Sequence, residues 1–184
     1  MSFKKRFSRF LLKCAGWKAV ALTPDYNKCV LVVAPHTSNW DFIVGKLAYN
    51  ALGRQGHFLI KKEWFRFPFK FFFKSIGGIP VDRGKKNQRM TDTIIDLFSK
   101  YDHFSLGITP EGTRKPNAKW KRGFYHIALG AKVPIVLVKL DYGNKCASLF
   151  QVFHPSGDEE ADILAIKEAY RGVRAKNPKQ FLID

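Results

Sequence analysis

The chain has 184 residues, enough for one compact domain in which folding buries roughly 70% of the surface that the unfolded chain exposes. Its hydrophobic content of 46% excludes intrinsic disorder as the default state, and no internal repeat is visible in the sequence. Lys and Arg total 32 against 15 Asp and Glu, so the net charge of +17 indicates an anionic partner. We therefore expect residues 1–184 to form a single domain.

The cysteines and the apolar stretches limit the cellular setting. Cys14, Cys29 and Cys146 are odd in number and far apart, which predicts neither a disulfide framework nor a zinc site and favours a reducing cytosolic environment. Lys13 and Lys18 interrupt the apolar stretch near the N-terminus, so we expect no signal peptide and no transmembrane segment. The five histidines show no metal-ligand spacing such as HExxH, and no metal is expected.

The first predicted element is a basic amphipathic helix over residues 3–20. Its apolar residues recur at spacings of three and four, with five Lys or Arg residues between them. The apolar residues are Phe3, Phe7, Phe10, Leu11 and Cys14. Such a helix is typical of binding to the surface of anionic lipid, but its apolar stripe could equally pack on the domain. We predict that residues 1–22 associate with a membrane.

The rest of the chain alternates between predicted strands and helices. The strands are predicted at Lys28–Ala34, His57–Ile60, Ile79–Val81, Phe104–Ile108, Pro134–Leu140 and Ser148–Phe153. The helices are predicted at Phe42–Leu52, Glu63–Lys74, Asn87–Lys100, Phe124–Gly130 and Glu160–Lys176. This alternation predicts an α/β fold, a single layered domain with a mainly parallel sheet flanked by helices. We expect a catalytic core at 28–155 and a C-terminal helix and tail at 157–184.

The segment Lys61–Lys74, KKEWFRFPFKFFFK, combines seven Phe or Trp residues with five Lys or Arg residues. Cations beside interfacial aromatic rings fit the headgroup region of a membrane. Single-stranded nucleic acid is the rival partner, because bases also stack on aromatic rings beside basic grooves. We favour the membrane, since Phe suits hydrocarbon better than base stacking, and consider nucleic acid unlikely. Pro68 argues against one uninterrupted helix in this segment.

His36 and Asp41 form the first candidate for chemistry. They flank a turn-forming segment directly after a predicted buried strand, where α/β folds place their functional loops. A carboxylate that holds one ring nitrogen of a histidine leaves the other nitrogen free to accept a proton, which makes a general base near neutral pH. On a straight helix five residues separate two side chains by about 140°, so a contact requires a turn that leads into a helix. The alternative is a surface His beside an unrelated capping Asp.

Two further segments place an arginine after a short strand. Arg83 follows Gly78–Asp82, and Arg114 follows Glu111, Gly112 and Thr113. Arginine offers a fork of donors that matches phosphate oxygens, and a glycine lets the backbone come close to a ligand. Both arginines also have local explanations, a surface turn for Arg83 and a pair with Glu111 for Arg114.

Taken in order, these segments resemble the motifs of the glycerophospholipid acyltransferase family, in particular the 1-acylglycerol-3-phosphate (lysophosphatidic acid) acyltransferases. The four matching segments are His36-x4-Asp41, Gly78–Arg83, Pro110–Arg114 and Val133–Val136. The resemblance spans roughly residues 30 to 140. The sequence departs from the family pattern at Leu137, where many members carry a second proline, and at Asn39 and Trp40 inside the first motif.

The resemblance implies transfer of a fatty acyl group from an acyl-carrier-protein or coenzyme A thioester to the hydroxyl of a lyso-lipid, with no bound cofactor. His36 would be the general base and Asp41 would orient it, while Arg83 and Arg114 would grip an anionic headgroup. Glu111, Gly112 and Thr113 would shape the acceptor pocket.

The expected acceptor is 1-acylglycerol-3-phosphate, with another lyso-lipid such as a lyso-aminolipid as the alternative. The expected location is peripheral, on the cytoplasmic face of a membrane. The competing interpretation is a non-catalytic basic module that binds membrane or nucleic acid, and a phosphatase or metal hydrolase is a third, weaker possibility.

Overall fold

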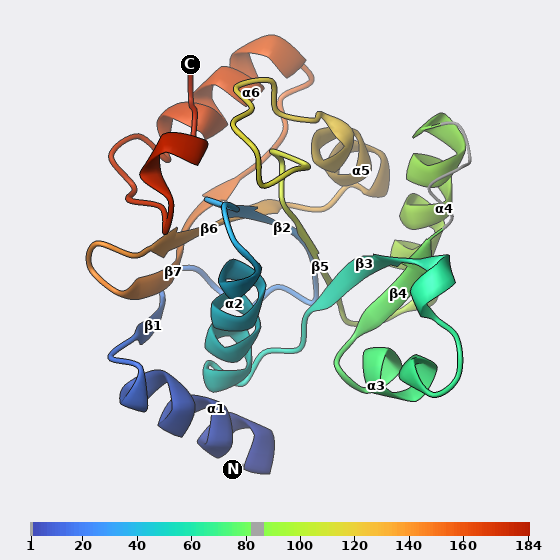
Figure 1. The fold of residues 1–184 in the computed structure, drawn as a ribbon. Coiled ribbons are helices and arrows are strands. Elements are labelled where there is room, and N and C mark those ends of the chain that lie inside the picture. Colours follow the sequence, from blue (N-terminus) through green and yellow to red (C-terminus); the bar gives the residue numbers. More distant parts are fainter. Residues whose placement is uncertain (1, 82–86) are drawn as a thin grey trace.

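A computed structural model describes residues 2–81 and 87–184, with residues 87–89 described by their backbone alone. The helices are α1 (Phe3–Cys14), α2 (Asn39–Ala51), α3 (Phe69–Ser75), α4 (Asn87–Lys100), α5 (Gly123–Ala131) and α6 (Glu159–Glu168), with 3-10 turns η1 (Lys62–Trp64) and η2 (Pro178–Gln180). The strands are β1 (Lys18–Ala21), β2 (Lys28–Ala34), β3 (His57–Lys61), β4 (Gly78–Val81), β5 (Phe104–Ile108), β6 (Ile135–Asp141) and β7 (Cys146–Phe153) (Figure 1).

The strands form one seven-stranded sheet in the order β1-β7-β6-β2-β5-β3-β4. Neighbouring strands are parallel except β6 and β7, which form an antiparallel pair. The predicted α/β fold with a mainly parallel sheet is therefore confirmed. Since β2 lies between β6 and β5 in parallel register, the residues that follow these three strands emerge at the same edge of the sheet.

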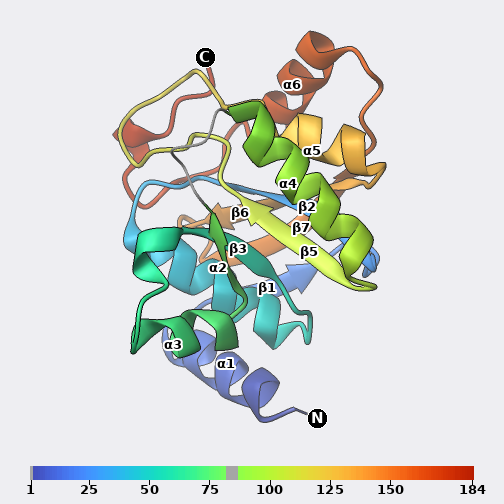
Figure 2. The same cartoon turned by 90° about the vertical axis from the view of Figure 1, so that its right-hand side faces the viewer.

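Helices cover both faces of the sheet (Figures 1 and 2). On one face, α4, α5 and α6 pack on alternate residues of the central strands, including Val30, Val32 and Ile135. On the other face, α1 and α2 pack through Leu12 and Val44 against Leu140. Because β2 is buried on both faces, its sequence is a continuous apolar run rather than an alternating one.

The prediction of a helix over residues 3–20 is wrong in its last third. The helix ends at Cys14, and Gly16 adopts a positive φ of 74° that turns the chain toward the sheet. Residues 18–21 then form β1, which pairs in parallel with β7. Periodicity missed this strand because it is short, lies at the edge of the sheet and has no buried residue.

Two other predicted helices are shorter than expected. In place of a helix over Glu63–Lys74, the chain forms the turn η1 and then α3, which begins directly after Pro68. Proline restricts the residue before it and lacks an N–H donor, so the helix starts only beyond it. The predicted helix Glu160–Lys176 ends at Glu168, and Gly172 has a positive φ of 81° in the turns that follow.

Tyr170, in those turns, joins two strands of the sheet. Its hydroxyl donates to the Val32 carbonyl oxygen at 2.6 Å and accepts from the Val138 N–H at 3.1 Å. The pairing of β6 with β7 shifts register between Leu137 and Val138, which is where a bulge disturbs the ladder. The fully buried hydroxyl therefore supplies a partner for a backbone N–H at that irregularity.

We expect Tyr170→Phe to lower the free energy of unfolding by about 1–3 kcal/mol, because it leaves a buried N–H without its acceptor. Urea denaturation monitored by circular dichroism measures the change. Tyr101→Phe is the matched control, since Tyr101 is exposed on the loop after α4. Equal stability of the Tyr170→Phe variant and the wild type would contradict the bridging role.

Candidate active site

The first and third motifs meet at the edge of the sheet. His36 follows β2 and Glu111 follows β5, and these strands are paired in parallel up to Val32 and Ile108. The His36 N–H donates to Glu111 Oε1 at 3.0 Å, which ties the two loops together. The topology thus brings together two segments that lie 75 residues apart in the sequence.

Asp41 lies in the first turn of α2, which begins at Asn39 and not at Phe42 as predicted. Ser38 is the N-cap residue, and its N–H and that of Thr37 donate to Asp41 Oδ2 at 2.7 and 2.6 Å. A capping carboxylate at this position satisfies N–H groups that the helix itself leaves unpaired. Because His36 precedes the helix, the turn removes the angular separation that a continuous helix would impose.

The imidazole of His36 faces the Asp41 carboxylate. The Nδ1 atom lies 3.8 Å from Asp41 Oδ2, which is within ion-pair distance but longer than a hydrogen bond. The Asp41 side chain is 1% exposed and that of His36 is 22% exposed, so one group is sealed and the other reaches solvent. Burial lowers the pKa of His36 below 6.5 and Arg114 acts in the same direction, while the Asp41 charge opposes them.

Glu111 is almost fully buried beside this pair. Burial raises its pKa to about 7, against the opposing hydrogen bond from the His36 N–H. Its second oxygen, Oε2, is buried with no hydrogen-bond partner among the residues that the structure describes. The next residue, Gly112, has a positive φ of 66°, and a Cβ there would lie only 2.7 Å from the Lys121 side chain. Both features explain a glycine at this position.

The remaining predicted site residues are only partly brought together. Arg114 is exposed and donates a hydrogen bond to Asn39 Oδ1, so it lies beside the His36 loop. Thr113 uses its hydroxyl to accept from the Lys115 N–H within its own loop. Arg83 lies outside the described residues. Among the described residues Arg114 forms no ion pair with Glu111, which is against the local explanation considered for that arginine.

Two residues that contact the His36–Asp41 segment were not predicted from the sequence. The Tyr142 hydroxyl donates to Asp41 Oδ1 at 2.6 Å, and Asn177 contacts Thr37 twice, through its backbone N–H at 3.2 Å and its side-chain amide at 2.9 Å. Both residues are far from the motif in sequence and carry no local pattern of their own. Tertiary structure alone identifies them.

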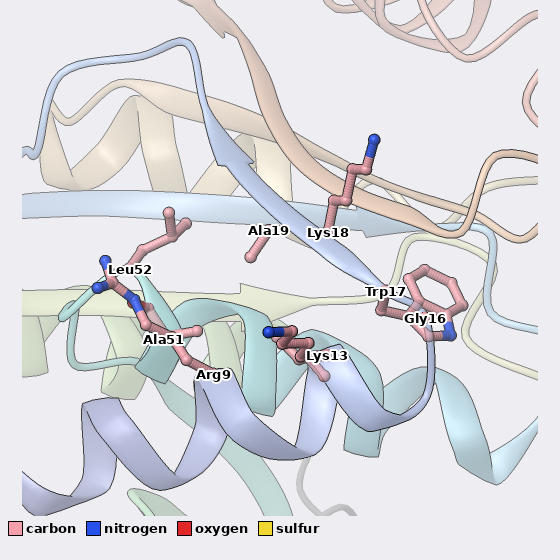
Figure 3. A pocket seen from close by; sticks show the side chains of 9 residues that line it. Arg9, Lys13, Gly16, Trp17, Lys18, Ala19, Ala51 and Leu52 are labelled. Atoms are coloured by element: carbon pink, nitrogen blue, oxygen red, sulfur yellow. The ribbon is translucent and has the colours of Figure 1, made fainter.

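Cavities also lie away from this pair of residues. A cavity of about 320 Å³ lies between α1, β1 and the end of α2, with Arg9, Lys13 and Trp17 among its lining residues (Figure 3). A larger one, about 650 Å³, lies beyond the ends of β3 and β4, and Lys62 and Phe65 are among its lining residues.

In the described part of the chain no cluster of His, Cys, Asp or Glu could hold a metal ion. No helix in that part is long and apolar enough to cross a membrane.

Comparison with known proteins gives two matches. The sequence model of the Acyltransferase family matches residues 19–140. Among solved structures, the chain is similar to the 1-acyl-sn-glycerophosphate (LPA) acyltransferase PlsC from Thermotoga maritima, with a TM-score of 0.58 and 18% sequence identity. That alignment covers 94% of this chain and 80% of the other. A search of curated protein sequences found no match.

We expect Glu111 to make the stability of the protein depend on pH. Its folded pKa of about 7 exceeds its usual 4.5, so the stability that it contributes is present below pH 4.5 and is lost as the pH rises through 7. The loss is at most about 3 kcal/mol. Glu111→Gln keeps an acceptor for the His36 N–H but cannot ionise.

Urea denaturation at pH 5 and at pH 8 checks this expectation. The Gln variant should gain stability relative to the wild type between the two values, because only the wild type must ionise a buried carboxyl. Parallel stability curves for the two proteins would show that Glu111 does not titrate as its burial implies.

Proposed function

Because this chain belongs to the Acyltransferase family, we propose that it moves a fatty acyl group from an acyl-carrier-protein or coenzyme A thioester to the hydroxyl of a lyso-lipid. The preferred acceptor is 1-acylglycerol-3-phosphate, which would give phosphatidic acid. The observation that carries the proposal is the geometry of His36, a partly exposed imidazole that faces a sealed carboxylate at the edge of the sheet. The family predicted from the motifs is confirmed by the match over residues 19–140.

In the proposed reaction His36 is the general base. With Nδ1 directed at Asp41, Nε2 is available to take the proton of the acceptor hydroxyl as its oxygen attacks the thioester carbonyl carbon. The carbon–sulfur bond then breaks, and the imidazolium gives its proton to the leaving thiolate. Asp41 orients the ring and offsets the positive charge that develops on it. A lowered pKa keeps His36 in its neutral, proton-accepting form at neutral pH.

An anionic headgroup would bind beside this base. Arg114 is exposed and anchored to Asn39 in the first turn of α2, so its guanidinium adds positive charge close to His36. Arg83 would act with it, and Glu111, Gly112 and Thr113 would shape the pocket. A phosphate matches the planar donor fork of arginine, which supports lysophosphatidic acid over a neutral acceptor.

We also propose that the protein binds peripherally to an anionic membrane, on its cytoplasmic face. Large apolar side chains are exposed on α1, on α2 and over η1 and α3. They are Phe3, Phe7, Phe10, Trp40, Phe42, Ile43, Trp64, Phe67, Phe69, Phe71 and Phe72. Helices α1 and α3 lie at the same end of the molecule in both views, opposite α6 (Figures 1 and 2). Exposed rings among cations fit the boundary between lipid headgroups and hydrocarbon.

We expect His36→Ala to lower the rate of acyl transfer about 10²- to 10⁴-fold, the usual contribution of a general base. Purified protein is assayed with labelled acyl-carrier protein or acyl-coenzyme A and lysophosphatidic acid, and circular dichroism checks the fold. His154→Ala, at an exposed histidine after β7, is the control. Full activity of the His36→Ala variant would refute the mechanism.

An assay with a panel of lyso-lipids identifies the acceptor. Activity only with another lyso-lipid would show that this lipid, and not lysophosphatidic acid, is the substrate.

The pH profile of the same reaction gives a second prediction. Because burial lowers the pKa of His36, the neutral base persists below pH 6.5, and the acid limb of kcat/KM should fall with a midpoint below that value. Rates measured from pH 4.5 to 8 locate the midpoint. A midpoint well above 6.5 would contradict the assignment of His36 as the titrating base.

The membrane surface can be tested without the reaction. We expect the double variant Phe71→Ser, Phe72→Ser to bind anionic vesicles roughly tenfold more weakly, because it removes two exposed rings that would enter the interface. Leu164→Ser, at an exposed apolar residue on α6, is the matched control. Co-sedimentation with anionic and neutral vesicles at low and high salt measures binding. Equal losses in both variants would place the membrane contact elsewhere.

A further inference from the structure

Tyr142 directly follows β6, and its hydroxyl donates a hydrogen bond of 2.6 Å to Asp41 Oδ1. It lies 101 residues from Asp41 and just beyond the segment that the family model matches. We propose that Tyr142 is a positioning residue, which fixes the rotation of the Asp41 carboxylate and so sets its orientation toward His36. This inference rests on the proposed role of His36 as general base.

The structure holds the Tyr142 ring and backbone in place on several sides. The ring packs edge to face against Trp17, with centroids 4.8 Å apart and planes at 87°. The Tyr142 N–H donates to the Arg174 carbonyl oxygen at 2.8 Å. The preceding residue, Asp141, accepts from the Gly143 and Asn144 N–H groups and so stabilises the turn after β6. The hydroxyl therefore meets Asp41 in a constrained direction.

Trp17 connects this arrangement to the N-terminal segment. It lies in the turn between α1 and β1 and lines the cavity there (Figure 3). Its indole packs against the small apolar cluster between α1, α2 and the sheet, which includes Val44 and Leu140. A tyrosine that only filled space would not need its hydroxyl directed at a carboxylate, and an edge-to-face aromatic contact is available to phenylalanine as well. The hydrogen bond is the feature that requires tyrosine.

The two oxygens of the Asp41 carboxylate have different partners, which gives the Tyr142 hydroxyl a function. Oδ2 accepts from the Thr37 and Ser38 N–H groups and faces His36, while Oδ1 accepts from the Ser38 hydroxyl at 3.0 Å and from Tyr142. Rotation of a carboxylate about its last bond is otherwise broad. Donors on Oδ1 thus keep Oδ2 turned toward the imidazole.

The hydroxyl stays a donor throughout the working pH range. Burial raises the pKa of Tyr142 above its ordinary value, and the contact with Asp41 raises it further. Among the described residues, the charged or titratable groups that act on His36 or contact it include Asp41, Arg114 and Glu111. A change at Tyr142 therefore reaches His36 through Asp41, because the hydroxyl helps to hold the carboxylate charge toward the imidazole.

The test is the titration of the His36 imidazole by NMR in the Tyr142→Phe variant, with its signal identified by its absence from the His36→Ala spectrum. Loss of the hydroxyl frees the Asp41 carboxylate to turn away from the imidazolium, so the pKa of His36 should fall by about 0.5 unit. We expect kcat to fall about tenfold with KM nearly unchanged, because the contacts that would bind the lyso-lipid and the acyl thioester are retained. Tyr101→Phe is the matched control and should change neither quantity.

A His36 pKa that is unchanged or raised in Tyr142→Phe, or an equal shift in Tyr101→Phe, would overturn the proposal. Trp17→Leu provides a second variant, because it keeps the hydroxyl and removes the ring that holds it. A shift in the same direction but smaller supports positioning, and an unchanged titration refutes the part assigned to Trp17. The titration needs no enzymatic turnover, so failure of the acyl-transfer proposal would appear separately, as absent activity in the wild-type protein.

Discussion

A carboxylate sealed from solvent is the constraint on which the candidate site depends. Asp41 is 1% exposed in its side chain, and an ionised group at such a position is tolerated only when hydrogen-bond donors surround it. Thr37, Ser38 and Tyr142 supply those donors. The positive end of the helix dipole at the first turn of α2 also favours a negative charge there. These same contacts start the helix and fix the loop that carries His36.

The sheet brings residues from separate loops to this carboxylate and its loop. Parallel pairing of β2 with β5 and β6 brings three loops to one edge, so that Glu111, His36 and Tyr142 approach Asp41 or its loop from different strands. The segment after α6 also contacts this loop, because Asn177 donates two hydrogen bonds to Thr37. An imidazole with a lowered pKa and a buried carboxyl with a raised one therefore lie next to each other. Such opposed shifts are typical of functional sites.

The exposed surface is consistent with the chemistry proposed at this edge. A lyso-lipid acceptor and a fatty acyl donor are both amphipathic, and a protein that uses them benefits from contact with the bilayer that holds them. The net charge of +17 and the exposed rings on α1 and α3 would supply electrostatic attraction and shallow insertion together. Membrane binding would then concentrate the protein where its substrates are.

The sequence by itself determined the fold class, the buried central strand and the family, because apolar periodicity and short motifs are local properties. It also predicted that His36 and Asp41 lie close together, because their approach depends on one turn. It failed for β1, where a short exposed strand has no apolar pattern, and for the lengths of α3 and α6, which Pro68 and the turns near Gly172 limit. Only the tertiary structure decided that Tyr142 and Asn177 reach the site, because contacts across more than a hundred residues are set by strand order and packing, which no local pattern encodes.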